Sequence, residues 1–371
     1  MHLAMDTYYL QAIVIALAII FVVAQNRKID IYPLFAVAVW LIGVSLIYGK
    51  YGTDQVNFYS NDQSVHLRIM RIYIQNEGFN LQSIIPLRYL ITYPTFLLSK
   101  IGLDEVLVLK TIQIVSLIGI YFKSKGVLTS KGISLKFWHF AFISSPLMFF
   151  FSLLALRDLT LALFTICFVF EYRFQRCVLF VILIFLLKPH LAIALVFGHF
   201  ALFLFKSLRS KFNLLQVFLF SVGSYLLGSY AFSVGSYFKD GFFPGFASGL
   251  FSQRNISQIL LNFSGLQFFS LINDQGSIVS ASTQFLLFTR IILFDSFLIP
   301  LSFLITTLFF LRKLKNESFL IFISFVFYLG LVSQTDFNST RQNIPFIAAM
   351  GLVSVVNIDC ALSLYRKKPL R

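Results

Sequence analysis

Apolar runs of nearly membrane-spanning length follow one another along the whole chain, separated by short polar segments. Runs of about 20 apolar residues with few charges predict transmembrane helices. The predicted spans are residues 8–24, 32–48 and 104–122, two hairpins over 137–170 and 177–205, and single spans over 213–235, 287–311, 318–334 and 343–363. The pattern therefore predicts an all-α, polytopic integral membrane protein with about 11 transmembrane helices.

The polar stretches predict how the rest of the chain is organised. Residues 49–103 and 236–286 each follow a span predicted to run outward and precede one predicted to run inward. They therefore form two external segments. The first segment contains a pattern that suits a membrane-lying helix near 84–98. No long polar region could form a separate soluble domain, so we expect residues 1–371 to form a single transmembrane domain.

The 34 residues from 137 to 170 cannot be one helix. A helix of that length rises roughly 50 Å, whereas the membrane core is about 30 Å thick, and its ends would emerge on opposite sides. Basic clusters flank both ends of the run and favour the same side for both. We therefore predict a hairpin whose outer turn lies at Arg157 and Asp158. Either charge would cost at least ~2.5–3.5 kcal/mol at mid-depth in a bilayer, so charged residues at this depth commonly mark a functional site.

A second break is predicted in the run 177–205, at Lys188, Pro189 and His190. The two halves of this run contain 11 and 15 residues, which is short for full spans. The turn should therefore lie below the membrane surface and inside protein. Irregular backbone at such depth is tolerated only where it is buried or lines a watery cavity.

Composition and charge agree with a membrane protein. Of the 371 residues, 58% are hydrophobic and only 12% are charged, and a soluble domain of this size could not bury that much apolar surface. The net charge of +15 does not indicate nucleic-acid binding, because 18 of the 30 Lys and Arg residues form clusters at span ends, as the positive-inside rule predicts. Cytoplasmic placement of these clusters predicts an external N-terminus and a cytoplasmic C-terminus. The clusters are Arg27/Lys28, Lys123/Lys125/Lys131/Lys136, Arg173/Arg176, Lys206/Arg209/Lys211, Arg312/Lys313/Lys315 and Arg366/Lys367/Lys368/Arg371.

Some of the remaining basic residues share a position on the outer side. Arg157, Lys188, Arg290 and Arg341 each stand at the outer, N-terminal end of a predicted inward-running helix. Helix N-termini carry partial positive charge and N–H groups without helical partners, so basic side chains beside them favour a phosphate or pyrophosphate ligand. Arg254, in the second external segment, is a fifth candidate. The alternative is that each residue only anchors its helix by extending its charge into water.

Several side chains are candidates for acid–base chemistry. Asp62 and His66 are four residues apart in a helical pattern, so they share one face, and a carboxylate beside an imidazole can orient a general base. His190 and Asp158, in the two predicted turns, are further candidates, as is Asp336. Acids are also common at helix starts, so the Asp62 and His66 pair has a structural explanation as well. No motif with metal-ligand spacing is present, so we predict no metal site.

Four short stretches carry a family resemblance: YGTDQVNFYSNDQSVHLRIMRIY (51–73), SSPLMFFFSLLALRDLTLAL (144–163), KPHLAIAL (188–195) and TRQNIPFIAAM (340–350). With the topology, they resemble the membrane polysaccharide polymerases of bacterial surface-glycan pathways. This Wzy/EpsG-like group is related to O-antigen ligases and to the wider GT-C-type glycosyltransferases. The resembling features are an aspartate with tyrosines after the second span, a proline–serine–arginine turn, and two later basic turns.

The resemblance implies a GT-C-like fold with short helices and buried turns at the periplasmic side of the bacterial inner membrane. It implies inverting, metal-independent transfer, without a cofactor, of a glycan from polyprenyl pyrophosphate to the non-reducing end of another lipid-linked repeat unit. Partners would be these lipid-linked glycans and the lipid bilayer, with a chain-length regulator protein as a further candidate and no nucleic acid. Arginines would contact the pyrophosphate, which agrees with the anion site inferred from charge. The resemblance singles out no general base.

Two other functions stay open at this point. A GT-C glycosyltransferase that uses a polyprenyl-phosphate sugar would carry an early acidic pair, which Asp54 or Asp62 match only loosely. A lipid-linked oligosaccharide transporter would need charged residues through the whole depth of the membrane. Here charge is sparse in the middle of the spans and dense outside, which favours chemistry at the surface.

Overall fold

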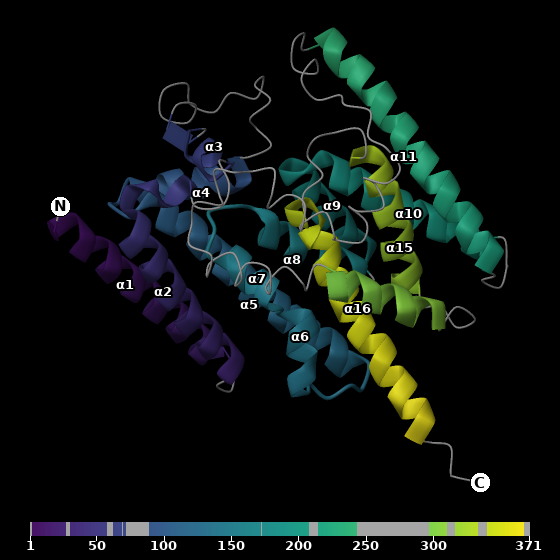
Figure 1. The fold of residues 1–371 in the computed structure, drawn as a ribbon, viewed down its shortest axis with the longest axis horizontal. Coiled ribbons are helices and arrows are strands. Elements are labelled where there is room, and N and C mark those ends of the chain that lie inside the picture. The colour runs from purple at the N-terminus through teal and green to yellow at the C-terminus, as the bar shows by residue number, and fades with distance from the viewer. Residues whose placement is uncertain are drawn as a thin grey trace. The chain divides into compact units, whose positions relative to one another are not determined.

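The computed structural model of the protein describes residues 2–26, 30–57, 62–68, 70–71, 89–171, 173–207, 214–242, 297–309, 316–332 and 340–366. These residues form helices and connecting turns and contain no β-strand (Figure 1). The elements are α1 (His2–Asn26), α2 (Ile31–Tyr51), the 3-10 helix η1 (Gly52–Asn57), α3 (Asp62–Arg68), α4 (Tyr89–Ser99), α5 (Glu105–Ser130), the 3-10 helix η4 (Phe137–His139), α6 (Phe140–Ile143), α7 (Pro146–Ser152), α8 (Asp158–Val169), α9 (Phe174–Leu187), α10 (Pro189–Ser207), α11 (Leu214–Phe242), a helix over Phe297–Phe309, α15 (Asn316–Val332) and α16 (Thr340–Arg366).

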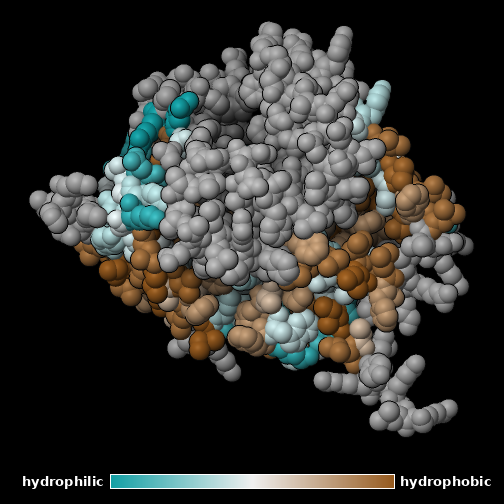
Figure 2. Space-filling model, in the orientation of Figure 1, coloured by the Kyte–Doolittle hydropathy of each residue, from teal (hydrophilic) through white to brown (hydrophobic). Residues whose placement is uncertain are grey.

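Five helical stretches among the described residues are long and apolar enough to cross a membrane. The stretches are Thr7–Gln25, Ile31–Val56, Glu105–Ser130, Pro189–Lys206 and Asn343–Leu362, and six shorter apolar helices accompany them. Large apolar side chains such as Leu17, Phe21 and Phe218 are exposed, and brown apolar residues cover much of the described surface in Figure 2. Exposed apolar surface of this extent suits lipid. The described residues confirm the prediction of an all-helical fold with several helices long and apolar enough to span a membrane, and the number of about 11 spans and the GT-C-like arrangement stay predictions.

The two predicted breaks are present. Helix α7 ends at Ser152 and α8 begins at Asp158, so the first break precedes Asp158. Helix α9 ends at Leu187 and α10 begins at Pro189, so Lys188 is the single residue between them. Proline fits the first position of a helix because its missing N–H would have no helical partner there.

Two helices extend seven residues or more beyond the C-terminal ends of their predicted spans. Helix α5 continues past residue 122 to Ser130, and α11 continues past residue 235 to Phe242. The basic residues Lys123 and Lys125 therefore do not end α5. Lysine is a good helix former, and its long side chain can carry the charge into water while its apolar part remains near the membrane.

The chain divides into two compact units. Unit 1 comprises Met1–Lys123 and Ser144–Leu163, and unit 2 comprises Ser124–Ile143 and Phe164–Arg371. The candidate residues from the sequence are thus distributed over both units, and each unit has its own internal packing.

In unit 1, α1 and α2 lie side by side and α5 runs along the same pair (Figure 1). The rings of Tyr8 and Tyr48 stack at one end of the pair, with centroids 3.7 Å apart. Beyond the other end, the hydroxyl of Tyr121 on α5 donates a hydrogen bond to Asp30 at 2.6 Å. Asp30 precedes α2 and so lies at the end of the pair opposite Tyr8 and Tyr48. The later part of α5 is therefore at the Asp30 end, and its start lies near Tyr8.

In unit 2, α15 packs against both α10 and α11. Stacked rings of Phe197 and Phe327, 4.0 Å apart, contribute to the contact between α10 and α15. Two ion pairs fix the connection after α5, because Lys131 contacts Glu317 at 2.8 Å and Lys136 contacts Asp359 at 2.7 Å. The start of α15 and the last turns of α16 therefore lie at the same end of unit 2.

Candidate functional site

The turn before α8 places Arg157 at the start of an apolar helix. The carbonyl oxygen of Arg157 accepts the first helical hydrogen bond of α8, from the N–H of Leu161 at 3.0 Å. Asp158 is the first residue of the helix and is buried, whereas Arg157 is half-buried. The predicted position of this pair, an arginine and a carboxylate at the N-terminus of an apolar helix, is present in unit 1.

Helix α3 packs against this turn. Oε1 of Gln63, which is buried, accepts a hydrogen bond from the backbone N–H of Ala155 at 2.7 Å. His66 lies one turn further along α3 and is also buried, and Asp62 is the first residue of that helix. The structure therefore brings the segment that carries Asp62 and His66 to the turn that carries Arg157, although nothing in the sequence pattern had joined them.

Polar side chains of α5 hold the first turn of α8. Oε1 of Gln113 accepts a hydrogen bond from the N–H of Leu159 at 3.2 Å, and Nε2 of Gln113 donates to Thr160 at 3.3 Å. Ser116 contacts the Thr160 hydroxyl at 3.0 Å. One N–H group of this helix N-terminus is therefore bonded within the protein and is not offered to a ligand. The anion-binding part of the hypothesis rests on Arg157 more than on the helix end.

A buried lysine lies on the same helix. Lys110 is 1% exposed, and its Nζ donates a hydrogen bond to Oε1 of Gln55 at 2.7 Å. The hydroxyl of Tyr8 donates to the same oxygen at 3.1 Å. A charged or polar group inside a membrane span is costly and commonly marks a functional site. Lys110 lies within the predicted span 104–122, and the sequence pattern does not join it to Gln55 or Tyr8. The signal that could have found this group is the run of polar residues at three-residue spacing, Lys110, Gln113 and Ser116.

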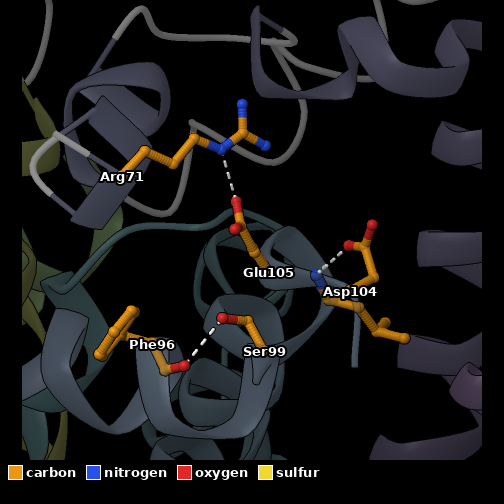
Figure 3. Close-up of polar contacts among 6 residues, drawn as sticks. Arg71, Phe96, Ser99, Asp104 and Glu105 are labelled. Atoms are coloured by element: carbon orange, nitrogen blue, oxygen red, sulfur yellow. Dashed lines mark hydrogen bonds and ion pairs between the residues drawn. The ribbon is translucent and has the colours of Figure 1, made fainter. Parts of the chain in front are cut away.

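An open pocket of about 720 Å³ lies in unit 1 beside this buried group. Its walls come from the first turns of α1 and α5, the last turns of α2 and α4, and Arg71 after α3. Figure 3 shows Arg71 and Glu105 reaching toward one another, with Ser99 and Phe96 on α4 and Asp104 at the start of α5. The lining residues are Thr7, Tyr8, Gln11, Tyr48, Thr53, Arg71, Phe96, Ser99, Lys100, Gly102, Leu103, Asp104, Glu105 and Val106.

Hydrogen bonds fix the loop that forms one wall of the pocket. Nε2 of Gln11 donates to the carbonyl oxygen of Gly102 at 3.0 Å, and its Oε1 accepts from the N–H of Asp104 at 2.8 Å. Oδ1 of Asp104 accepts from the N–H of Leu107 at 2.8 Å and so caps α5. Gly102 has φ of 91°, a left-handed conformation that glycine adopts without strain. The pocket wall is therefore ordered by its own contacts.

The second predicted turn lies inside unit 2. Lys188 is buried, and its Nζ lies 5.3 Å from the ring centroid of Tyr328 on α15. The ring of His190 stacks near the same tyrosine, with centroids 5.8 Å apart. Of the predicted turn, Lys188 is buried in protein, whereas Pro189 and His190 are half-buried, and the depth of the turn in the membrane stays a prediction. Lys188 and His190 belong to unit 2 and Arg157 to unit 1, so a joint pyrophosphate site stays a prediction.

The remaining candidates fall at or beyond the limits of the described residues. Arg341 is the second residue of α16, which starts at Thr340. Arg254, Arg290 and Asp336 lie outside the described residues. Their predicted roles stay predictions.

No protein-family model, no curated protein and no solved structure matches this chain. The resemblance to polysaccharide polymerases therefore rests on the short stretches that carry it.

Proposed function

We propose that this chain is a glycosyltransferase that polymerises lipid-linked oligosaccharide repeat units at the periplasmic face of the bacterial inner membrane. The observation that carries the proposal is Arg157 at the start of α8, in a turn that Gln63 and Gln113 hold from two other helices. An arginine held at a helix start is suited to bind a phosphate-containing group through two parallel N–H donors.

The chemistry assigned to this turn is transfer of a glycan from polyprenyl pyrophosphate. A hydroxyl oxygen of the acceptor forms a bond to the anomeric carbon, and the bond from that carbon to the pyrophosphate oxygen breaks. The pyrophosphate gains negative charge as it leaves, and the guanidinium group of Arg157 stabilises that charge with two parallel N–H donors. The proton of the acceptor hydroxyl goes to a general base. Asp62, His66 and Asp158 are the candidates in unit 1, since α3, which carries Asp62 and His66, packs against the turn.

The experiment that tests the proposed function is electrophoresis of the surface glycan from a strain that lacks this protein. We expect single exported repeat units in place of long chains, and long chains again when the protein is restored. Unchanged chain length in the deletion strain would contradict a polymerase. Loss of even a single exported repeat unit would also contradict it and would indicate an earlier transferase or a transporter.

A further inference from the structure

The open pocket of unit 1 is distinct in composition from the Arg157 turn. Two basic residues, Arg71 and Lys100, and two acidic residues, Asp104 and Glu105, line it, so its formal charges balance. Nε of Arg71 contacts Oε2 of Glu105 at 2.7 Å. A phosphate in this pocket would face two carboxylates, which disfavours an anionic ligand.

The rest of the lining offers hydrogen-bonding groups beside apolar surface. Hydroxyl groups come from Thr7, Thr53 and Ser99, and apolar surface comes from Phe96 and Val106. A sugar has the matching chemistry, since each hydroxyl group both donates and accepts hydrogen bonds and the ring carbons are apolar. The paired guanidinium and carboxylate groups supply donors and acceptors side by side.

The volume and the order of the pocket suit a ligand of this kind. About 720 Å³ lies within the range of roughly 300–1,000 Å³ that is typical of small-molecule sites. Gln11 fixes the loop that carries Gly102 and Asp104, so the wall does not have to be ordered by the ligand.

The buried group behind the pocket is a second, independent observation. Tyr8 lines the pocket and donates to Gln55, which also accepts from Lys110. Gln55 and Lys110 are 2% and 1% exposed. Burying an amide and an amine costs free energy that a purely structural helix contact would avoid with apolar residues. The buried group holds the Tyr8 hydroxyl in one orientation at the pocket wall.

We propose that this pocket binds a hydroxyl-rich segment of the acceptor glycan, recognised through its sugar hydroxyls and not through phosphate. The identification of the ligand as the acceptor rests on the proposed function. Arg71, Glu105 and Ser99 are the residues assigned to contact it, and the glycan enters from the open side of the pocket.

The test is binding of the repeat-unit oligosaccharide, released from the host strain's surface glycan and freed of phosphate, to the purified full-length protein. Saturation-transfer NMR and calorimetry with wild type and Arg71→Ala measure the affinity. We expect saturable binding that is roughly tenfold or more weaker in Arg71→Ala, as for loss of a charge-assisted hydrogen bond. The matched control is Arg176→Ala, since Arg176 is also in an exposed ion pair, with side-chain exposure of 57% against 61% for Arg71.

Each outcome separates this inference from the proposed function. Equal oligosaccharide affinity in wild type, Arg71→Ala and Arg176→Ala would overturn the glycan pocket, as would displacement of the oligosaccharide by inorganic pyrophosphate from the wild-type pocket. Arg157→Lys should bind the oligosaccharide with wild-type affinity. Full-length polymer in a deletion strain would contradict the proposed polymerase activity. It would not change the conclusion on oligosaccharide binding by the pocket. An unchanged melting temperature of Arg71→Ala shows that any loss of affinity is not a loss of folding.

Discussion

Gly228 on α11 and Gly330 on α15 bring the backbones of these two helices into direct contact. A Cβ atom at Gly228 would overlap the carbonyl oxygen of Phe327, and a Cβ atom at Gly330 would overlap the carbonyl oxygen of Tyr225. Each glycine thus admits the backbone of the partner helix, and the contact is reciprocal. Small residues at such positions are a common means of packing helices in membranes, where lipid reduces the hydrophobic driving force.

The first prediction concerns this contact. Gly228→Ala and Gly330→Ala should each lower the melting temperature, since overpacking costs roughly 1–3 kcal/mol. The control is Gly223→Ala on the same helix α11, where a Cβ atom would meet nothing within 4 Å. Alanine is a better helix former than glycine by up to about 1 kcal/mol, so Gly223→Ala should be neutral or stabilising. The measurement is the melting temperature of the wild type and the three variants in the same detergent. Equal melting temperatures would show that α11 and α15 do not pack this closely.

The second prediction concerns Arg157. Arg157→Lys keeps the positive charge but loses the two parallel donors, so polymerisation should fall by roughly 10²–10³, as for the loss of one transition-state donor. Arg157→Ala should be no better. Glycan chain length and the rate of chain growth, at equal membrane abundance of the protein, are the measurements. Arg176→Lys, at an exposed ion pair, is the control and should retain wild-type chains. Wild-type chain length in Arg157→Lys and Arg157→Ala would show that this residue only anchors its helix in the membrane.

The third prediction concerns the buried hydrogen bond between Lys110 and Gln55 and its contribution to stability. Gln55→Leu removes the acceptor for the buried amine and should destabilise the protein by about 1–3 kcal/mol. Lys110→Met removes the buried amine, and the Tyr8 hydroxyl keeps its partner, so stability should hold or increase.

The double variant tests the coupling directly. If the two side chains interact as the 2.7 Å contact indicates, Lys110→Met should recover the part of the Gln55→Leu loss that comes from the amine, and the part that comes from the Tyr8 hydroxyl should remain. Denaturation of the two single variants and the double variant gives the interaction free energy. Strictly additive losses would contradict the contact. Loss of oligosaccharide binding in a stable Lys110→Met protein would show that the buried group supports the pocket.

The fourth prediction concerns orientation in the membrane. Helix α5 has 26 residues and rises roughly 39 Å, enough to place its two ends on opposite sides of a core about 30 Å thick. Thr53, in η1, lines the same pocket as the start of α5, and Thr129 is exposed near the end of α5. In a protein whose Cys167, Cys177 and Cys360 are replaced by serine, Thr53→Cys should react with a membrane-impermeant maleimide in spheroplasts. Thr129→Cys should react only after lysis. The reverse pattern would invert the proposed topology and move the Arg157 turn to the cytoplasm.

The sequence predicted the breaks in the helices better than the contacts between them. Run length and flanking charge were enough to predict the breaks at Arg157 and Lys188, because a helix longer than the membrane is thick has to turn. Helix ends were less predictable, since Lys123 and Lys125 continue α5 as good helix formers and carry their charge to water.

The candidate site was predicted in part. The position of Arg157 and Asp158 at a helix start followed from the local pattern, and their partner Gln63 did not. The pairing of Arg71 with Glu105 joins residues 34 positions apart and depends on how α3, α4 and α5 pack. Glycine contacts such as Gly228 with Phe327 have no local signal, because the neighbour that excludes a side chain comes from another helix.

The polar residues of α5 also set an order for assembly during synthesis. Lys110 is the sixth residue of α5, and an ionisable side chain within an isolated span is costly to insert without a partner. Gln55 precedes Lys110 in the chain, so the acceptor for the amine is already made when α5 leaves the ribosome. Thr160 follows, so Gln113 must wait for α8 before its amide is bonded. Helix α5 can therefore pack against η1, which carries Gln55, first, and the turn that carries Arg157 is completed only when α8 arrives.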